Sequence, residues 1–224
     1  MCGRFSITAG LPDILDSFQV NKVAVHYEFR YNISPTQHVP VIVSRNGQRI
    51  MEKYRWGLFP YWAKDSINTD CESLTEKRAF RKMFSKNRCI IPSSGFYSWK
   101  RHGNKQQPVC IKLRDRNVFG MAGIYDVWKD PRGNEIRTFT IITSKANSLV
   151  AQYQERMPVI LEDSYLDFWL DPGITDENFL QRILMPGQAE RMTVHPVSPA
   201  VNDENNESPE CVEEYYPDTV LVKN

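Results

Sequence analysis

The sequence has few cysteines, no paired cysteine motif and no long hydrophobic run. Its five cysteines are an odd number, and no two of them stand in a CxxC arrangement. This pattern argues against a disulfide framework and against a zinc site, so we expect no metal and no cofactor. No apolar run at the N-terminus resembles a signal peptide, and no stretch is long enough to cross a bilayer. We therefore expect a cytoplasmic protein without a membrane partner.

The net charge is also small, at +1, and by itself predicts no binding to a polyanion. The charges are nevertheless segregated: no Asp or Glu interrupts the basic residues of segment 77–105, whereas segment 203–218 is rich in acidic residues. Two interpretations of the basic segment stay open, a solvated helix face and a surface that binds phosphates. Aromatic residues lie within it, namely Phe80, Phe84, Phe96, Tyr97 and Trp99. They favour the second interpretation slightly, because bases of single-stranded nucleic acid stack on such rings.

Alternating apolar residues predict strands through the first two thirds of the chain. The strongest hairpin pattern runs from VPVIVS to IMEKYRWGLF, with Asn46 and Gly47 at the reversal. RCIIPSSGFYSWKR is typical of two strands that meet at a glycine bend, and QPVCIKLR, VFGMAGIYDVWKD and TFTIIT continue the β pattern. YNISPT is expected to be a turn, because Pro35 disfavours helix at the residue before it.

Helical spacing is confined to a few short segments. The apolar residues of 12–20, 73–84, 164–170 and 176–184 recur at helical intervals. Strands with a few helices around them indicate an α+β fold with mostly antiparallel pairing. No shift in composition marks a boundary before the acidic end of the chain, so a single domain is expected.

The chain opens with MCGRF, which places Cys2 directly after the initiator methionine. Removal of Met1 would leave Cys2 with a free α-amine and a thiol on adjacent carbons. Their unperturbed pKa values, about 8 and about 8.5, leave some of each group nucleophilic at neutral pH. Such an aminothiol condenses with an aldehyde to an imine, and the thiol then closes a five-membered thiazolidine. The alternative is that Cys2 is only a small residue near the start, since a single cysteine is weak evidence.

Several other polar residues stand in apolar or aromatic surroundings. They are Arg4, Asn32, Asn68, Arg156 and His195. Taken singly, each is more often structural, as an asparagine in a turn, an arginine on carbonyl groups or a histidine satisfied in a loop. Their position relative to Cys2 therefore decides whether any of them belongs to a site.

Seven segments together resemble a known family. In chain order they are MCGRF, YNISPT, RWGLFPYWAKD, the INxxxE stretch at residues 67–72, IIPSSGFYSWK, ERMPVIL and HPVSPAVN. Their order and approximate spacing resemble the SRAP family, the SOS-response-associated peptidase-like proteins that crosslink to abasic sites in single-stranded DNA. The resemblance extends to about Pro209, which predicts an SRAP domain over 1–209 and an acidic C-terminal tail over 210–224.

The resemblance implies a mostly antiparallel, barrel-like sheet with flanking helices, and a role in the response to DNA damage. The implied partner is single-stranded DNA with abasic sites, bound by a monomer that is nucleoid-associated when on DNA. It also implies two catalytic residues. Cys2 is the nucleophile that forms a thiazolidine with the aldehyde of the opened sugar, and Asn68 orients the reacting groups beside it.

Five DNA-binding residues are implied by the same resemblance: Arg4, Pro35, Arg78, Trp99 and Arg156. The arginines match family residues that hold DNA phosphates, a task that suits the guanidinium group. The indole is positioned to stack on a base, and the proline lies in a loop near the DNA.

Three positions depart from the family pattern. Ser98 replaces a glutamate that acts as general acid and base, and a serine hydroxyl cannot take that role at neutral pH without a base of its own. Gln154 replaces a histidine, and an amide forms hydrogen bonds but does not shuttle a proton. Asp70 replaces an arginine at a phosphate site, where an anion repels the ligand.

These departures leave alternative functions open. The leading hypothesis is an abasic-site crosslinking protein whose capture step survives, while peptidase, lyase or release activity is weakened. The first alternative is a pseudoenzyme that binds DNA or protein on the same fold. The second is a thiol peptidase acting on other peptides, which ranks last because no His or carboxylate at the matched positions could activate Cys2.

Overall fold

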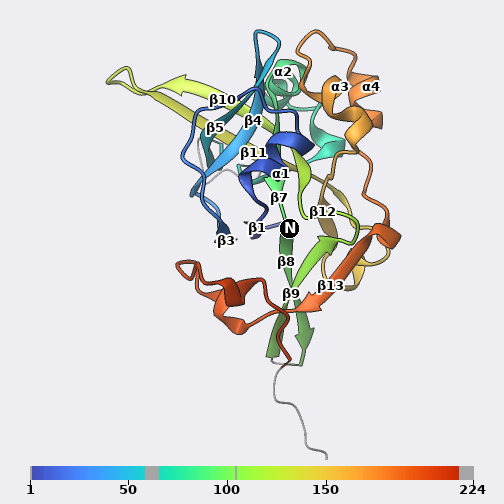
Figure 1. Cartoon of the computed structure of the whole chain (residues 1–224). Helices are drawn as coiled ribbons and strands as arrows, with labels where there is room; N and C mark the ends of the chain where they lie inside the picture. Colours follow the sequence, from blue (N-terminus) through green and yellow to red (C-terminus); the bar gives the residue numbers. More distant parts are fainter. Residues whose placement is uncertain (1, 59–65, 104, 217–224) are drawn as a thin grey trace, which may run out of the picture.

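The computed structural model describes residues 2–58, 66–103 and 105–216, whose strands form two sheets (Figure 1). The larger sheet makes up the upper part of the molecule in this view, and the smaller sheet extends below it. The N-terminus lies where the two sheets meet. Cys2 is therefore placed by strands of both.

The smaller sheet has five strands and is antiparallel throughout. In spatial order it contains β13 (Met192–Pro196), β9 (Lys105–Leu113), β8 (Gly95–His102), β1 (Phe5–Ile7) and β3 (Arg30–Ile33). Strand β1 pairs with β8 on one side and with β3 on the other. The residues that precede β1, including Cys2, consequently lie next to the continuation of β8.

The larger sheet has eight strands. Seven follow the order β12 (Arg156–Pro158), β11 (Glu135–Lys145), β10 (Phe119–Lys129), β7 (Arg88–Ser93), β4 (His38–Arg45), β5 (Gln48–Trp56) and β2 (Lys22–Val23). The eighth, β6 (Asn68–Asp70), pairs in parallel with β11. A further parallel pairing joins β11 to β5 and closes β5, β4, β7, β10 and β11 into a barrel-like sheet. This confirms the predicted α+β fold with mostly antiparallel strands.

The helices are short and lie outside the sheets. They are α1 (Leu11–Ser17), α2 (Arg78–Lys86), α3 (Leu166–Leu170) and α4 (Glu177–Arg182), with single 3₁₀ turns such as η1 (Cys71–Ser73), η2 (Val150–Gln152), η3 (Asp163–Tyr165), η4 (Ala189–Arg191), η5 (Pro199–Asn202) and η6 (Pro209–Cys211). Asp176 caps α4, because its carboxylate accepts hydrogen bonds from two backbone N–H groups of the first turn. Each helix of the described residues is too short or too polar to span a bilayer.

A continuous apolar core joins the two sheets. Trp56 of β5 is fully buried, packs edge-on against Phe5 of β1 at a ring separation of 5.1 Å and stacks on Phe139 of β11. Between β7 and β8 the chain passes from one sheet to the other at Ser94. The next residue is glycine because a Cβ at Gly95 would lie 2.8 Å from Cys110 Sγ.

The predicted hairpin and the glycine bend are confirmed. β4 and β5 pair in register around Asn46 and Gly47, which take positive φ angles of 52° and 77° at the reversal. The helix predicted over 73–84 begins later, at Arg78, because residues 71–73 form a separate 3₁₀ turn.

Two expectations of local structure are wrong. The turn predicted for YNISPT begins only at Pro35, because Tyr31, Asn32 and Ile33 belong to β3 and pair with β1. The basic segment also presents fewer aromatic rings than its sequence predicts. Its rings at 84, 96 and 97 are fully buried, so they cannot stack on a base.

Candidate functional site

Cys2 lies buried at the junction of the two sheets. Its side chain has no exposed surface, and its thiol donates a long hydrogen bond to the Arg4 carbonyl, 4.0 Å from Sγ. Burial raises the pKa of the thiol to about 12, so the group is protonated at neutral pH. In this state the sulfur is a weak nucleophile.

Asn68 is the nearest polar side chain to Cys2 in the hydrogen-bond network. Its Nδ2 donates to the Cys2 carbonyl oxygen over 2.7 Å. The pairing of β6 with β11, in which Asn68 faces Ile141, places the amide there. Asn68 is 7% exposed, and its buried Oδ1 has no hydrogen-bond partner within the described part of the chain. The structure therefore brings together the two residues predicted to be catalytic and leaves an acceptor beside them.

Ser98 lies across the strand pair from the N-terminal residues. The backbone N–H of Tyr97 donates to the Arg4 carbonyl over 3.0 Å, so the register of β1 and β8 puts Ser98 opposite Gly3. The Ser98 hydroxyl donates to Gln154 Oε1 over 3.2 Å. This bond leaves Nε2 of Gln154 as a buried donor without a partner among the described residues. Two of the three departures from the family pattern thus form one uncharged pair.

The third departure, Asp70, binds a predicted DNA-binding arginine. Nε of Arg156 lies 2.7 Å from Asp70 Oδ1, and Nη2 lies 2.7 Å from Glu72 Oε2. Arg156 also donates to Thr143, whose hydroxyl in turn donates to Asp70 over 3.1 Å. One guanidinium therefore lies between two carboxylates, which leaves the group with net negative charge.

The pKa values of this group show how tightly its charges interact. Burial alone would lower the pKa of Arg156, but its hydrogen bond with Glu72 and the charge of Asp70 raise it. Burial likewise opposes ionisation of Glu72, yet the hydrogen bond from Arg156 lowers the pKa of that carboxyl. Arg156 and Glu72 are therefore charged at neutral pH. Nε and Nη2 of the guanidinium are already bound to protein oxygens.

Arg4 is held inside the protein. It is 7% exposed and donates to Asn32 Oδ1 at 2.8 Å, the Val201 carbonyl at 2.7 Å and Glu204 Oε1 at 3.0 Å. These contacts tie β1 to β3 and to the chain after η5. A phosphate would have to displace Glu204 to reach this guanidinium.

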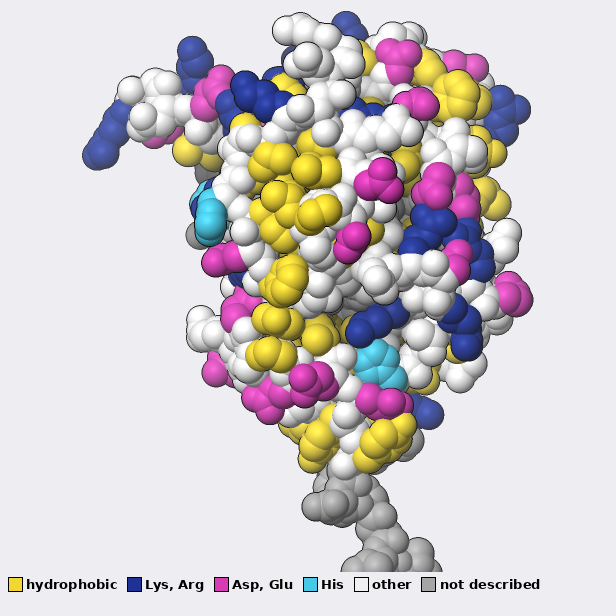
Figure 2. Space-filling view, viewed as in Figure 1, with side chains coloured by type: hydrophobic (Ala, Val, Ile, Leu, Met, Phe, Trp, Pro, Cys, Tyr) yellow, Lys and Arg dark blue, Asp and Glu magenta, His cyan; other side chains and the backbone are white. Residues whose placement is uncertain are grey.

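The C-terminal segment 199–216 packs along the smaller sheet, a contact that the sequence did not predict. The indole N–H of Trp99 donates to Asn202 Oδ1 over 2.7 Å, and Glu207 binds Arg30 together with two backbone N–H groups of β3. Nε2 of His195 in β13 is 3.0 Å from the Val212 carbonyl oxygen. Because a carbonyl oxygen only accepts, Nε2 is the donor. Acidic side chains gather over the lower part of the face in Figure 2, where this segment runs. The only signal in the sequence was the HPVSPAVN motif.

Two predicted DNA-binding residues lie apart from the Cys2 network. Pro35 is partly exposed in the turn after β3, and Arg78 is exposed at the start of α2. Neither forms a hydrogen bond with Cys2 or Asn68 in the described residues. The boundary predicted at residue 209 stays a prediction. Residues 210–216 pack against the body of the protein, and residues 217–224 lie outside the described residues.

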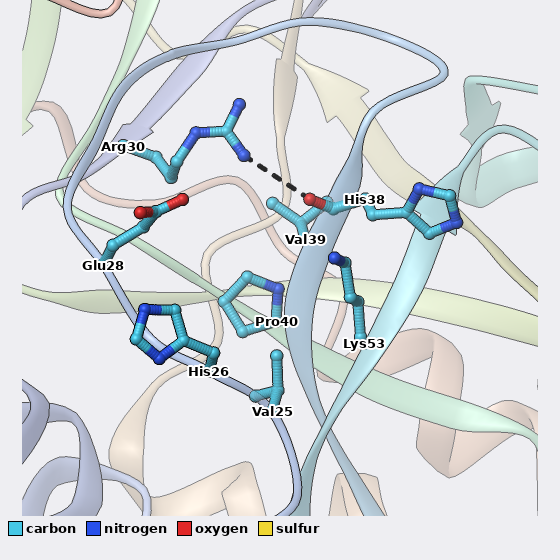
Figure 3. Close-up of a pocket in the computed structure, with 8 residues that line it drawn as sticks. All are labelled: Val25, His26, Glu28, Arg30, His38, Val39, Pro40 and Lys53. Carbon is cyan, nitrogen blue, oxygen red and sulfur yellow. Dashed lines mark hydrogen bonds between the residues drawn. The ribbon is translucent and has the colours of Figure 1, made fainter.

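A hollow of about 50 Å³ lies away from Cys2, between the chain before β3 and strands β4 and β5 (Figure 3). It is lined by Val25, His26, Glu28, Arg30, His38, Val39, Pro40 and Lys53. The ring of His38 points away from the other residues drawn. Burial and two nearby cations lower the pKa of this histidine, which keeps it neutral at pH 7. The hollow shares no residue with the Cys2 network.

Around Cys2, the side chains can form hydrogen bonds but cannot transfer protons at neutral pH. Ser98, Gln154 and Asn68 are uncharged, so the network offers one buried donor and one buried acceptor to a polar ligand. Within the described ranges, no group of His, Cys, Asp and Glu side chains could hold a metal ion.

Comparison with known proteins identifies sequences that are similar along most of the chain. The family model described as SOS response associated peptidase (SRAP) matches residues 1–204. The chain is 41% identical to the Bacillus subtilis protein named abasic site processing protein YoqW, over 96% of this chain and 100% of that protein. It is 30% identical to abasic site processing protein HMCES of Xenopus tropicalis, over 83% of this chain and 66% of that protein.

The fold also matches solved structures. A crystal structure of a protein from Bacteroides thetaiotaomicron superposes with a TM-score of 0.83 at 26% identity, covering 96% of this chain and 100% of that one. The likeness therefore includes most of the chain, and with it both sheets.

Proposed function

Because the chain belongs to the SOS response associated peptidase (SRAP) family, we propose that it processes abasic sites by capturing their aldehyde through Cys2 in single-stranded DNA. The observation that carries this proposal is the Asn68 amide, whose Nδ2 donates to the Cys2 carbonyl over 2.7 Å while its buried Oδ1 has no hydrogen-bond partner among the described residues. A purely structural asparagine would not be expected to leave this acceptor unpartnered, because an unsatisfied buried polar atom costs about 1–3 kcal/mol.

The chemistry follows from the N-terminus that remains once Met1 is removed. The α-amine of Cys2 adds to the aldehyde carbon of the opened deoxyribose, and loss of one water gives an imine. The Cys2 sulfur then adds to the imine carbon, forming a C–S bond, while the thiol proton passes to the imine nitrogen. The product is a thiazolidine, and no oxidant or cofactor takes part. Holding amine, thiol and aldehyde together supplies the main acceleration.

The adduct is expected to be long-lived in this protein. Reversal of the thiazolidine needs a proton on the ring and a water activated for attack, which calls for a group that titrates near neutral pH. Ser98 and Gln154 form an uncharged hydrogen bond instead. Their amide and hydroxyl can bind the sugar hydroxyl groups but cannot donate and recover a proton. We therefore propose capture with slow release, and weak lyase and peptidase activity.

A single gel experiment tests this function. Protein whose mass confirms removal of Met1 is incubated with a single-stranded oligonucleotide that carries one abasic site, and then separated under denaturing conditions. A heat-stable shifted band is expected. Cys2→Ser should abolish it, while Cys110→Ala, which removes a buried thiol from β9, should not. Absence of the band in the wild type would contradict capture.

Restoring the family residues tests the slow release. Ser98→Glu combined with Gln154→His should shorten the lifetime of the purified adduct by at least about tenfold, because both an acid and a base return to the site. The measurement follows loss of the shifted band after excess competitor aldehyde is added. An unchanged lifetime would mean that these two positions do not control release.

A binding module without covalent chemistry is the second candidate function. Full burial of the Cys2 thiol favours it, because a buried, protonated thiol is a weak nucleophile. The two functions differ in the same gel, because a binding module retards native DNA without forming a band that resists denaturation. A thiol peptidase is disfavoured, because the polar neighbours of Cys2 include no group able to deprotonate it.

A further inference from the structure

Three positive side chains follow one line along the exposed side of α2. Arg78, Lys82 and Lys86 are all exposed and stand four residues apart. Residues at this spacing lie on the same side of a helix and about 6 Å apart along its axis. Here we call these three residues the α2 row.

The helix is fixed so that the α2 row faces outward. On its opposite side Met83 and Phe84 are buried, and Phe84 packs against Trp169 of α3 with ring centres 6.1 Å apart. Arg81 forms an ion pair with Glu177 of α4, with 2.6 Å between Nε and Oε1. The row is therefore presented on a helix that packs against its neighbours through its other side.

The charge of the row is not compensated. None of its three side chains forms an ion pair or a hydrogen bond with a carboxylate anywhere in residues 2–58, 66–103 and 105–216. The acid that reaches α2 from the neighbouring helix, Glu177, is already bound to Arg81. Glu76, exposed just before the helix, is the remaining acid close by in the sequence.

The other positively charged residues assigned to DNA are occupied. Arg156 lies between Asp70 and Glu72, and Arg4 is buried against Glu204. The α2 row is close in sequence to the carboxylates that bind Arg156. Strand β6 ends at Asp70, η1 follows it, and only residues 74–77 separate η1 from α2. The exposed positive charges of α2 are thus close in sequence to β6 and η1, whose carboxylates neutralise Arg156.

We propose that the α2 row binds the phosphate backbone of a single-stranded nucleic acid whose abasic site lies at Cys2. The proposal rests on the proposed function and extends the resemblance, which implicates Arg78 alone. The regular spacing of the three charges suits successive phosphates of one extended strand. The contact is electrostatic, independent of base sequence and sensitive to salt.

Removal of the three charges tests the proposal. Affinity for an intact, fluorescently labelled single-stranded oligonucleotide is measured by anisotropy over a range of salt concentrations. The triple variant Arg78→Gln, Lys82→Gln, Lys86→Gln should bind about tenfold or more weakly at low salt. The slope of log K against log salt should flatten by about 2, since each phosphate that the variant no longer neutralises accounts for about 0.7. Glutamine has a helix propensity close to that of arginine and lysine, so α2 is retained.

Two matched variants distinguish a specific effect of the α2 row from a general effect of net charge. Lys22→Gln, Lys129→Gln, Arg132→Gln removes the same charge from exposed positions outside α2, and should weaken binding less than twofold. Arg78→Lys, Lys82→Arg, Lys86→Arg keeps the charge and should keep the affinity. Equal weakening by both neutralising triples, or no effect of the α2 triple, would overturn the proposal.

The outcome is independent of covalent capture. If the wild type forms the Cys2 adduct and the triple variant of the α2 row binds DNA normally, the proposed role of the α2 row is wrong while the proposed function stands. If the wild type forms no adduct but the α2 triple loses affinity, the row stands and the capture function is wrong.

Discussion

Burial of Cys2 controls when its thiol can react. The pKa of the thiol is raised to about 12, against about 9 for an exposed thiol, so the thiolate fraction near pH 8 is about a thousandfold smaller than in an open chain. We expect native protein that retains Met1 to be alkylated at Cys2 very slowly at pH 8, with a rate that rises tenfold per pH unit toward pH 12. Mass spectrometry of the N-terminal peptide after timed exposure to iodoacetamide measures this.

The same peptide in denaturant is the control for that measurement. Unfolding exposes the thiol, so its rate should level off above about pH 9. The raised pKa of Cys2 also makes folding stability depend on pH. Because the thiol is protonated up to a higher pH in the folded protein than in the unfolded chain, its contribution to the free energy of unfolding is complete below pH 9 and is lost between pH 9 and 12. Rapid alkylation of native protein at pH 8 would contradict the buried, protonated thiol.

Asp70 sets the charge beside the candidate site. Its carboxylate is 2.7 Å from Arg156 and half exposed, so it competes with a phosphate for the guanidinium and repels it. Asp70→Asn should raise affinity for intact single-stranded DNA about threefold to tenfold and steepen the salt slope by about 0.7. Anisotropy titrations at several salt concentrations measure both. Asp126→Asn, an exposed acid on β10, is the matched control and should change neither.

At the scale of elements, Arg88 joins β7 to the helices above it. The side chain is 3% exposed and donates to carbonyl groups of Phe84, Ser85, Trp169, Asp171 and Ile174. Burial lowers its pKa to about 10, so it remains charged at neutral pH. Its five hydrogen bonds hold the end of α2 and the chain after α3 on the barrel-like sheet.

Arg88→Met should therefore destabilise the protein by about 3–5 kcal/mol, since it leaves several buried carbonyl groups without a donor. Chemical denaturation at pH 7, followed by circular dichroism, measures the change. Arg132→Met, in the exposed turn after β10, should change the free energy of unfolding by less than about 0.5 kcal/mol. Equal midpoints for the two variants would mean that Arg88 does not hold α2 and α3.

The elements were predictable where the local signal and the tertiary environment agree. Asn46-Gly47 between two alternating runs specifies its hairpin without help from the rest of the chain. The β3 strand was missed because Pro35 gives a turn signal, whereas the pairing of Phe5 with Ile33, far apart in sequence, decides the conformation before it. The same kind of long-range contact determines which aromatic rings are buried.

The site was predictable to a similar extent. The position of Cys2 and its chemistry follow from the sequence, and the resemblance adds Asn68. The ion pairs on Arg156 and Arg4 do not follow, because Glu72, Glu204 and Asp70 reach them only after β6, β11 and the C-terminal segment have packed. A charge predicted to bind DNA can thus be neutralised by residues that no local pattern connects to it.

At the scale of the whole molecule, the C-terminal segment determines where the folded unit ends. Cys211 is fully buried with Tyr97 and Val201 in a small cluster beneath the segment. The Val212 carbonyl accepts from His195, and the backbone N–H of Tyr215 donates to the Pro196 carbonyl over 2.9 Å. A domain that ended at residue 209 would lack all of these interactions.

Two truncations test that boundary. A chain that ends at Pro209 should lose about 2–4 kcal/mol of stability, because one buried side chain and two hydrogen bonds disappear. A chain that ends at Tyr216 keeps these interactions and should unfold at the same midpoint as the full chain. Thermal and chemical unfolding of the three chains, compared at one protein concentration, measure the difference. If the shorter chain were as stable as the longer one, residues 210–216 would be a tail, as the sequence predicts. If it is less stable, the folded unit extends beyond Pro209 and includes the acidic segment that covers the smaller sheet.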